Sequence, residues 1–185
     1  MNRKFCNSLI VIENGQLVVY NLDDRISWNV GRPTKENHPD IQFRSTTVSR
    51  QHGKFENEGG FWLYKDNNGK NGTVYNGKHI QASRDGSVWP IMLEDKDVLI
   101  FGGGDEAIIN SKTIWAMYRE YQIDTQWRVA DTKSMTHIEF SNGENVECYS
   151  NPQKGMAVFG DTGMAIYMGD VTYLCGEMCV RSIDA

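Results

Sequence analysis

The stretch "LIVIENGQLVVYNL", residues 9–22, decides the fold class. Two apolar runs flank an Asn-Gly pair at residues 14 and 15, which is the strongest short-range signal for a β-hairpin. Six more short apolar segments follow between turn residues: "ISWNVGR" (26–32), "IQFRS" (41–45), "HGKFEN" (52–57), "FWLYKD" (61–66), "TVYNGKHI" (73–80) and "DVLIFG" (97–102). We therefore predict an all-β chain, and this number of short strands at this spacing favours a β-sandwich.

The segment "TIWAMYREYQI", residues 113–123, fits two kinds of element. Its length and several of its residues are compatible with a helix. Its aromatic and β-branched residues suit a strand better, because such side chains pack well on a pleated sheet. We predict a strand that closes the sandwich.

The character of the chain changes after about Tyr121. The segment "THIEFSNGENVECYS", residues 136–150, is predicted to form a hairpin around Asn142-Gly143, and "GMAVFGDT" (155–162) is nearly repeated as "GMAIYMGD" (163–170). Two copies are too few for a solenoid, which needs three or more units to bury its faces. We predict two domains, 1–122 and 123–185, the second a small β meander module.

Composition narrows the classes of function. The 185 residues are 39% hydrophobic and 11% aromatic, and the net charge is -5 from 24 acidic and 19 basic side chains. A general nucleic-acid binder is disfavoured, because the phosphate backbone rewards an excess of Lys and Arg. There is no run of eighteen apolar residues, so we expect a soluble, cytoplasmic protein without a membrane partner.

Neither a metal nor another cofactor is expected. The four cysteines fit reduced thiols in a cytoplasmic protein. Cys175 and Cys179 are spaced like zinc ligands, but no second pair of cysteines or histidines lies beside them, and structural zinc sites require four ligands.

Residues 47–55, "TVSRQHGKF", raise the possibility of a Ser49 nucleophile with His52 as its base. In a strand, residues three apart point to opposite faces, so the two side chains would diverge. No Gly-x-Ser-x-Gly elbow accompanies them. We expect no enzymatic activity, and we interpret Asp95 and Asp97 as turn residues.

The same region also fits an anion site. Arg32 follows Gly31 at the end of one predicted strand, whereas Ser49 and Arg50 lie in a second connection. Lys70 lies in a third connection, and alternate connections of a sandwich gather at one end. Guanidinium, hydroxyl and backbone amide groups on such loops are what a bound phosphate requires.

Five motifs in order carry a resemblance to a known family. They are "VGR", "DIQF", "VSRQH", "DNNGKNGTVYNG" and "LEDKDVLIFG". Together they resemble a forkhead-associated (FHA) domain over roughly residues 9–118. The resemblance implies an FHA-like eleven-stranded β-sandwich that binds phosphothreonine peptides through loops at one end.

The resemblance also implies a role for individual residues. Arg32 would pair with the phosphate, Ser49 would donate its hydroxyl to it, and Arg50 and Lys70 would add charge or amide donors. Asn71 would hold the main chain of the peptide by its side-chain amide. The residues implied to support the loops are Gly31, His52, Gly72, Thr73, Asn76 and Gly77.

Two positions depart from the family pattern. Gly69 stands where the family often has a serine, and Thr47 is uncharged where an acidic ligand residue would need a cation. The polar segment "PTKENHP", 33–39, is expected to be mobile.

The resulting hypothesis is a non-enzymatic adaptor in serine/threonine kinase signalling. Its partner would be a phosphothreonine-containing protein, either a substrate or an autophosphorylated form of a serine/threonine kinase. The alternatives are a phosphate-independent scaffold that kept the fold and a regulatory domain of a larger protein. For the C-terminal module, a second binding surface, a homodimer interface and the beginning of a further domain stay open.

Overall fold

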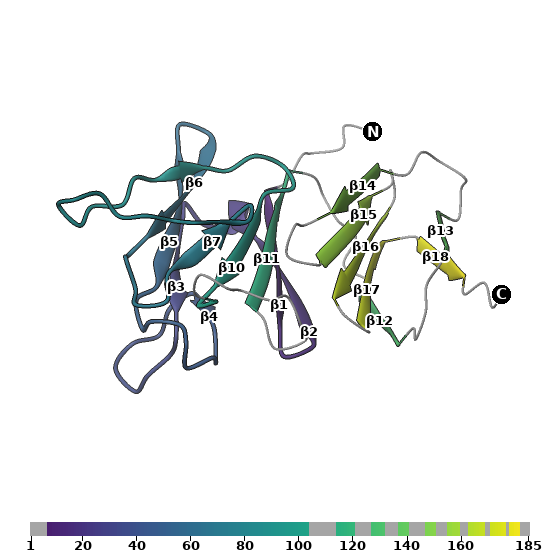
Figure 1. Cartoon of the computed structure of the whole chain (residues 1–185), viewed down its shortest axis with the longest axis horizontal. Coiled ribbons are helices and arrows are strands. Elements are labelled where there is room, and N and C mark those ends of the chain that lie inside the picture. Colours follow the sequence, from purple (N-terminus) through teal and green to yellow (C-terminus); the bar gives the residue numbers. More distant parts are fainter. Residues whose placement is uncertain are drawn as a thin grey trace. The chain divides into compact units, whose positions relative to one another are not determined.

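The protein, seen in a computed structural model, divides into two compact units (Figure 1). The first contains Met1–Ala107 and Thr113–Gln122, and the second contains Ile108–Lys112 and Ile123–Ala185. The structure describes residues 7–103 and 114–120, and beyond them seven strands between residues 127 and 181.

Two sheets make up the first unit. One has the strand order β2 (Gln16–Asn21), β1 (Ser8–Glu13), β11 (Ile114–Arg119), β10 (Val98–Phe101), β7 (Thr73–Tyr75) and β8 (Lys78–His79). The other has the order β4 (Ile41–Gln42), β3 (Ser27–Gly31), β5 (Gly53–Glu58), β6 (Phe61–Asp66) and β9 (Ile91–Met92). The 3-10 turn at Leu22–Asp24 is the only helical element among the described residues. The all-β prediction is confirmed, and the sheets form a β-sandwich.

Asn-Gly pairs make the tight turns of this unit. Asn14 and Gly15, with φ of 49° and 71°, join β1 to β2, and Asn76 and Gly77, with φ of 44° and 80°, join β7 to β8. Positive φ at both central residues gives the turn twist that matches paired strands. The predicted hairpin at residues 9–22 is therefore confirmed.

The last strand of the sandwich is β11. It pairs antiparallel with β1 on one side and with β10 on the other, so residues 114–119 form a strand and not a helix. Aromatic and β-branched content predicted this outcome correctly.

The core between the sheets is rich in aromatic rings. Phe43 lies 4.9 Å from Phe101, and Phe55 lies 4.9 Å from Tyr64, measured between ring centroids. All four side chains are almost completely buried. A close-packed aromatic core gives a rigid base for the loops at its ends.

The second unit contains a five-stranded antiparallel sheet and a two-stranded sheet. The larger has the order β12 (Trp127–Asp131), β17 (Val171–Gly176), β16 (Gly163–Met168), β15 (Gly155–Phe159) and β14 (Glu147–Ser150). β13 (His137–Phe140) pairs with β18 (Met178–Arg181) in the smaller. The near-repeats of the sequence are the neighbouring strands β15 and β16.

The hairpin predicted for residues 136–150 is wrong. β13 and β14 do not pair with each other, because β13 pairs with β18 and β14 pairs with β15. The turn residues 141–146 lie outside the described residues. A local Asn-Gly signal marks a chain reversal but does not decide which strands pair, since that depends on side-chain packing across the sheet.

No helix among the described residues is long and apolar enough to cross a membrane.

Candidate functional site

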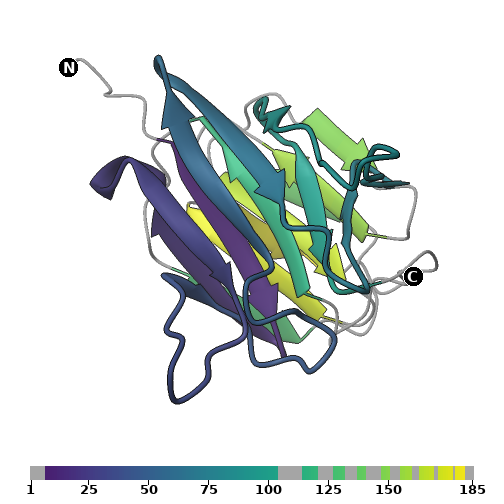
Figure 2. The ribbon, with the colours of Figure 1, turned by 90° about the vertical axis from the view of Figure 1, so that its left-hand side faces the viewer.

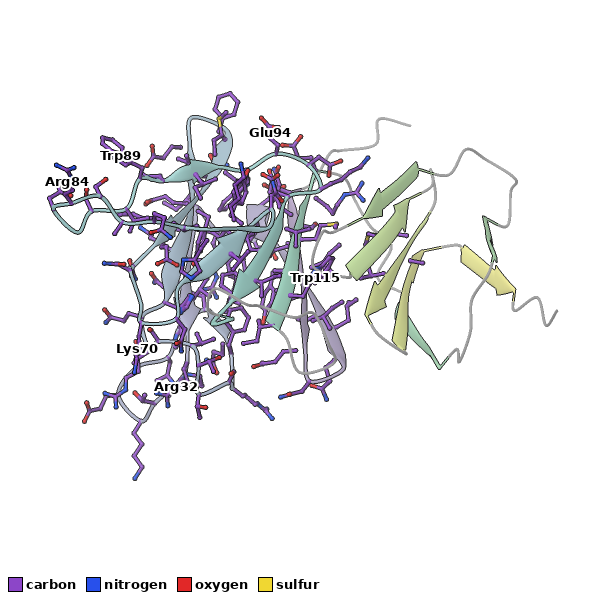
Figure 3. All side chains as sticks on the ribbon, viewed as in Figure 1. Arg32, Lys70, Arg84, Trp89, Glu94 and Trp115 are labelled. Atoms are coloured by element: carbon purple, nitrogen blue, oxygen red, sulfur yellow. The ribbon has the colours of Figure 1, made fainter. Side chains whose placement is uncertain are left out.

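Three loops meet at one end of the first unit. They are the connections 32–40, between β3 and β4, 43–52, between β4 and β5, and 67–72, between β6 and β7. In Figure 2 the first two extend from the lower end of the sandwich, and Figure 3 places Arg32 and Lys70 at that same end. We call these the three site loops.

Arg32 is held at the base of the first site loop. Its backbone N–H donates to the carbonyl of Ser49 (3.0 Å), and its half-buried guanidinium donates through Nε to the carbonyl of Val48 (3.3 Å). Within the described residues the Nη groups have no partner. The guanidinium is therefore oriented from one side and free to bind an anion on the other.

Gly31 makes the approach of the second loop possible. A Cβ atom on it would lie only 2.1 Å from the carbonyl oxygen of Arg50. The backbone of residues 49 and 50 runs directly against β3, so any side chain would push the loop away. Glycine is needed at position 31 because there is no space for a side chain, and not because the backbone has an unusual φ.

Ser49 presents an unpaired hydroxyl. Its backbone N–H donates to Nδ1 of His52 (3.2 Å), whereas its Oγ has no hydrogen-bond partner in the described part of the chain. Beside the hydroxyl lies Gly69, where a Cβ atom would come within 2.4 Å of Oγ. The position that departs from the family pattern thus leaves room for the Ser49 hydroxyl.

His52 lies beneath the loops, completely buried. Because Nδ1 accepts from Ser49, the proton of the neutral ring sits on Nε2, which donates to Oγ1 of Thr73 (3.0 Å). Thr73 donates in turn to Oδ2 of Asp66 (2.6 Å), and the Tyr64 hydroxyl contacts both of these oxygen atoms. Burial lowers the pKa of His52 despite the opposing effect of Asp66, so the neutral form is favoured.

The third site loop carries Lys70, Asn71 and Gly72. Asn71 donates from Nδ2 to the carbonyl of Thr47 (2.8 Å), which ties this loop to the second one. Lys70 is exposed, and its side chain has no partner among the described residues. Gly72 has a φ of +57°, the left-handed conformation that glycine adopts without strain.

Arg50 also points its charge to solvent. Its side chain is exposed and unpaired within the part that the structure describes, while its carbonyl accepts a hydrogen bond from Nδ2 of Asn37 (2.8 Å). The structure thus brings the five predicted binding residues to one end of the sandwich.

Asn76 and Gly77 lie at the other end of β7, away from the site loops. Asn76 donates from Nδ2 to Asp97 (2.7 Å), and its Oδ1 accepts from the backbone of Val98 (2.8 Å). Asp97 is buried and also accepts from the hydroxyl of Tyr75 (2.8 Å). These contacts brace the β7–β8 turn and contribute nothing to the surface of the site.

Sequence reasoning missed several residues that shape the site. Glu13, from the β1 end, accepts from the backbone N–H groups of Arg44 and Ser45 at the start of the second loop (2.8 and 3.1 Å). Asp66 and Tyr64 anchor His52 through Thr73. In the sequence, Asp66 and Tyr64 are marked only as polar groups at inward positions of a strand. The inward direction of a strand position can be recognised only in the structure.

The segment 33–39 forms a turn with hydrogen bonds of its own, and its mobility stays a prediction. Thr34 accepts through Oγ1 from the backbone N–H groups of Glu36 and Asn37 (3.3 and 3.0 Å), and its own N–H donates to the Asn37 carbonyl (2.8 Å). Asn37 then bonds to Arg50, as described above. Local side-chain caps, which polar loops readily form, hold this segment in a defined turn.

Positive charge is concentrated at this end. The cations of the three site loops are Arg32, Lys35, Arg44, Arg50 and Lys70. Their acids are the exposed Glu36, the buried Asp66 just before the third loop, and Asp40, which pairs with Arg25. No cluster of possible metal ligands exists among the described residues. An anion is the ligand that this end of an otherwise acidic chain attracts.

Comparison with known proteins agrees with this geometry. Residues 28–102 match the FHA domain family. The yeast splicing factor Pml1, in a structure that addresses its integration into the RES complex, superposes with a TM-score of 0.51 at 22% identity, over 66% of this chain and 85% of that one. No curated protein matches the chain in sequence.

Two further structures are FHA domains. That of CT664 from Chlamydia trachomatis is 20% identical, with a TM-score of 0.47 over 63% of this chain and 99% of its own. Another, studied for phosphothreonine-dependent FHA interactions, is 21% identical, with a TM-score of 0.40 over 62% of this chain and 98% of its own.

Residues 28–102 form an FHA domain, as the sequence motifs indicated. FHA domains are non-catalytic binding modules, and their typical ligand is phosphothreonine on another protein.

Proposed function

We propose that this FHA domain binds a phosphothreonine segment of another protein, and that the chain is an adaptor in cytoplasmic serine/threonine kinase signalling. One observation carries the proposal. The half-buried guanidinium of Arg32, oriented by the Val48 carbonyl, lies in the same loop cluster as the unpaired Ser49 hydroxyl and the unpaired Lys70 ammonium.

The chemistry of these groups suits a phosphate. A phosphothreonine carries about -1.5 to -2 charge near neutral pH and several strong acceptor oxygens. Arg32 supplies two Nη groups in a fixed plane, which suits a bidentate contact, and Ser49 supplies one neutral donor. Arg50 and Lys70 add charge from exposed positions, where each contributes less.

Asn71 has a second role in this proposal. One N–H of its side chain is used on the Thr47 carbonyl, which fixes the plane of the amide. The amide carbonyl and the second N–H then face the ligand main chain as one acceptor and one donor. A pair of this kind sets the register of an extended peptide beside its phosphothreonine.

The test is a fluorescence polarisation titration of the full chain with a fixed-phosphothreonine degenerate peptide library and its unphosphorylated counterpart. We expect phosphate-dependent binding near the micromolar range, about -8 kcal/mol. Arg32→Ala should abolish binding. Arg32→Lys should weaken it strongly, because an ammonium cannot reproduce the planar fork.

Arg84→Ala is the matched control, because Arg84 is an exposed arginine on the loop between β8 and β9 (Figure 3). It should bind like the wild type, and circular dichroism should show the same fold for all variants. Binding that ignores both the phosphate and Arg32 would contradict the proposal and favour a phosphate-independent scaffold.

A further inference from the structure

A hollow lies beside the β7–β8 hairpin, outside the three site loops. Its volume is about 250 Å³, and the residues that line it are Tyr75, Lys78, His79, Ile80, Val88 and Trp89, with Gln81 and Ile91. Trp89 is 78% exposed. Figure 3 shows it on the long β8–β9 connection, away from Arg32 and Lys70.

The loop that carries Trp89 has a defined conformation. Ser83 donates from its backbone N–H to the Ser87 carbonyl (2.7 Å), Gly86 donates to the Ser83 carbonyl (2.8 Å), and Ser87 donates from both N–H and Oγ to Asp85 (3.0 and 2.6 Å). The exposure of the indole therefore does not result from an irregular loop. An ordered, exposed aromatic side chain beside an apolar hollow is typical of an interaction surface.

The size of the hollow indicates what it can hold. Small-molecule sites generally enclose roughly 300 to 1,000 Å³, so about 250 Å³ is small for a cofactor. It is enough for one apolar side chain and the backbone next to it. Apart from Lys78, His79 and Gln81, the lining is apolar or aromatic, which excludes a second anion as the main occupant.

His79 connects the hollow to the third site loop. Its Nε2 lies 3.2 Å from the carbonyl oxygen of Asn71, and a Cβ atom on Gly72 would lie 2.5 Å from its ring. The ring thus packs directly on the backbone that follows Asn71. The hollow therefore adjoins the site loop that carries Asn71, and His79 belongs to both surfaces.

The strands at this side can accommodate an extended chain. β8 is the edge strand of one sheet and β9 is the edge strand of the other, and each is only two residues long. Short edge strands leave neighbouring backbone N–H and C=O groups unpaired, and an extended ligand can use these groups.

We propose that the Trp89 hollow binds an apolar side chain of the same phosphothreonine-containing polypeptide, at a distance from the phosphothreonine, so that the ligand is recognised at two points. The inference rests on the proposed phosphothreonine binding. Two linked contacts raise the overall affinity, because the second contact forms within one complex.

The test compares two libraries with a central phosphothreonine, one with three and one with ten degenerate residues on each side. Ten extended residues reach about 33 Å, far enough to extend well beyond the site loops. The full chain captures each library, and the bound peptides are sequenced. We expect an apolar residue to be enriched at one distal position of the long library.

Trp89→Ala should remove this enrichment and weaken binding of the enriched long peptide about tenfold, with binding of the short library unchanged. Phe61→Ala is the control, because Phe61 is another exposed aromatic (62%) that does not line the hollow. It should keep the enrichment.

The outcomes separate the two proposals. Phosphate-dependent capture that fails with Arg32→Ala, but shows no Trp89-dependent enrichment, would overturn the two-point ligand and leave the proposed function standing. Capture that ignores phosphate and Arg32 would overturn the proposed function, and the shared ligand with it. Self-association that depends on Trp89, measured by sedimentation without peptide, would assign the hollow to a second copy and also overturn the proposal.

Discussion

A Cβ atom on Gly69 would lie 2.4 Å from the hydroxyl oxygen of Ser49 and 3.2 Å from its Cβ. Gly69 does not have a positive φ, so its conformation would tolerate another residue. What the glycine provides is the space in which the Ser49 hydroxyl stays unpaired at the mouth of the site.

The first prediction is that Gly69→Ala lowers affinity for a phosphothreonine peptide several-fold by forcing the Ser49 hydroxyl to another rotamer. Stability should change little, since a hydroxyl can rotate. The measurement is a double-mutant cycle by isothermal titration calorimetry. In a Ser49→Ala background, Gly69→Ala should have almost no further effect, and two additive losses would contradict the explanation.

A side chain is tolerated less well at position 31 than at position 69. A Cβ atom on Gly31 would meet the backbone oxygen of Arg50 at 2.1 Å and the carbonyl carbon at 2.8 Å, and backbone cannot rotate away. Gly31→Ala should therefore destabilise the fold by about 1–3 kcal/mol and also weaken phosphopeptide binding. Urea denaturation with a parallel peptide titration measures both quantities, and wild-type behaviour in both would refute the close approach.

Thr73 joins His52 to Asp66 in a buried hydrogen-bond network. Thr73→Val keeps the shape but leaves the His52 Nε2–H without a partner and leaves Asp66 Oδ2 with only the Tyr64 hydroxyl as a donor, which should cost about 1–3 kcal/mol. Thr73→Ser keeps the hydroxyl and should lose less. The comparison of the two free energies of unfolding decides the point, because equal losses would mean that packing of the methyl group dominates.

Substitutions of Asn76 should change the stability of the protein without changing its binding of phosphopeptide. Asn76 holds a φ of 44° and makes two hydrogen bonds, to Asp97 and to the Val98 backbone. Asn76→Ala should destabilise the protein by about 2–3 kcal/mol, and Asn76→Gly by less, because glycine keeps the turn conformation. Folded samples of both variants should bind phosphopeptide normally, and a selective loss of affinity would place Asn76 in the site.

Local signals explain why so much of the first unit was predictable. The conformation of two turns can be predicted from their Asn-Gly pairs, Asn14-Gly15 and Asn76-Gly77, because few residue pairs adopt positive φ at both positions. Alternating apolar residues then specify the strands between the turns. Arg32, Ser49 and Lys70 could be grouped into one site because connections in a sandwich return to the same end.

Long-range relationships were not predictable in the same way. The pairing of β13 with β18 joins segments about forty residues apart, and the nearby Asn142-Gly143 turn signal pointed elsewhere. Glu13 acts on the second site loop from more than thirty residues away. Such contacts depend on which surfaces the folded chain brings together, so a sequence pattern alone does not reveal them.

The last prediction concerns pH and follows from the neutral His52. Burial lowers the pKa of His52 below its ordinary value of about 6.5. Below that pH the unfolded chain takes up a proton that the folded chain resists. The stability associated with neutral His52 is therefore fully present above about pH 6.5 and decreases as the pH falls from there toward the folded-state pKa.

Protonation of Nδ1 would also remove the acceptor for the Ser49 N–H, so phosphopeptide affinity should fall over the same range. Thermal unfolding between pH 7.5 and 5.5 tests the first effect, with His52→Gln and the exposed His38→Gln compared with the wild type. Wild type and His38→Gln should lose stability in parallel as the pH falls, whereas His52→Gln, less stable throughout, should show a flatter profile. Equal slopes for all three proteins would assign the pH dependence to other groups and contradict the prediction for His52.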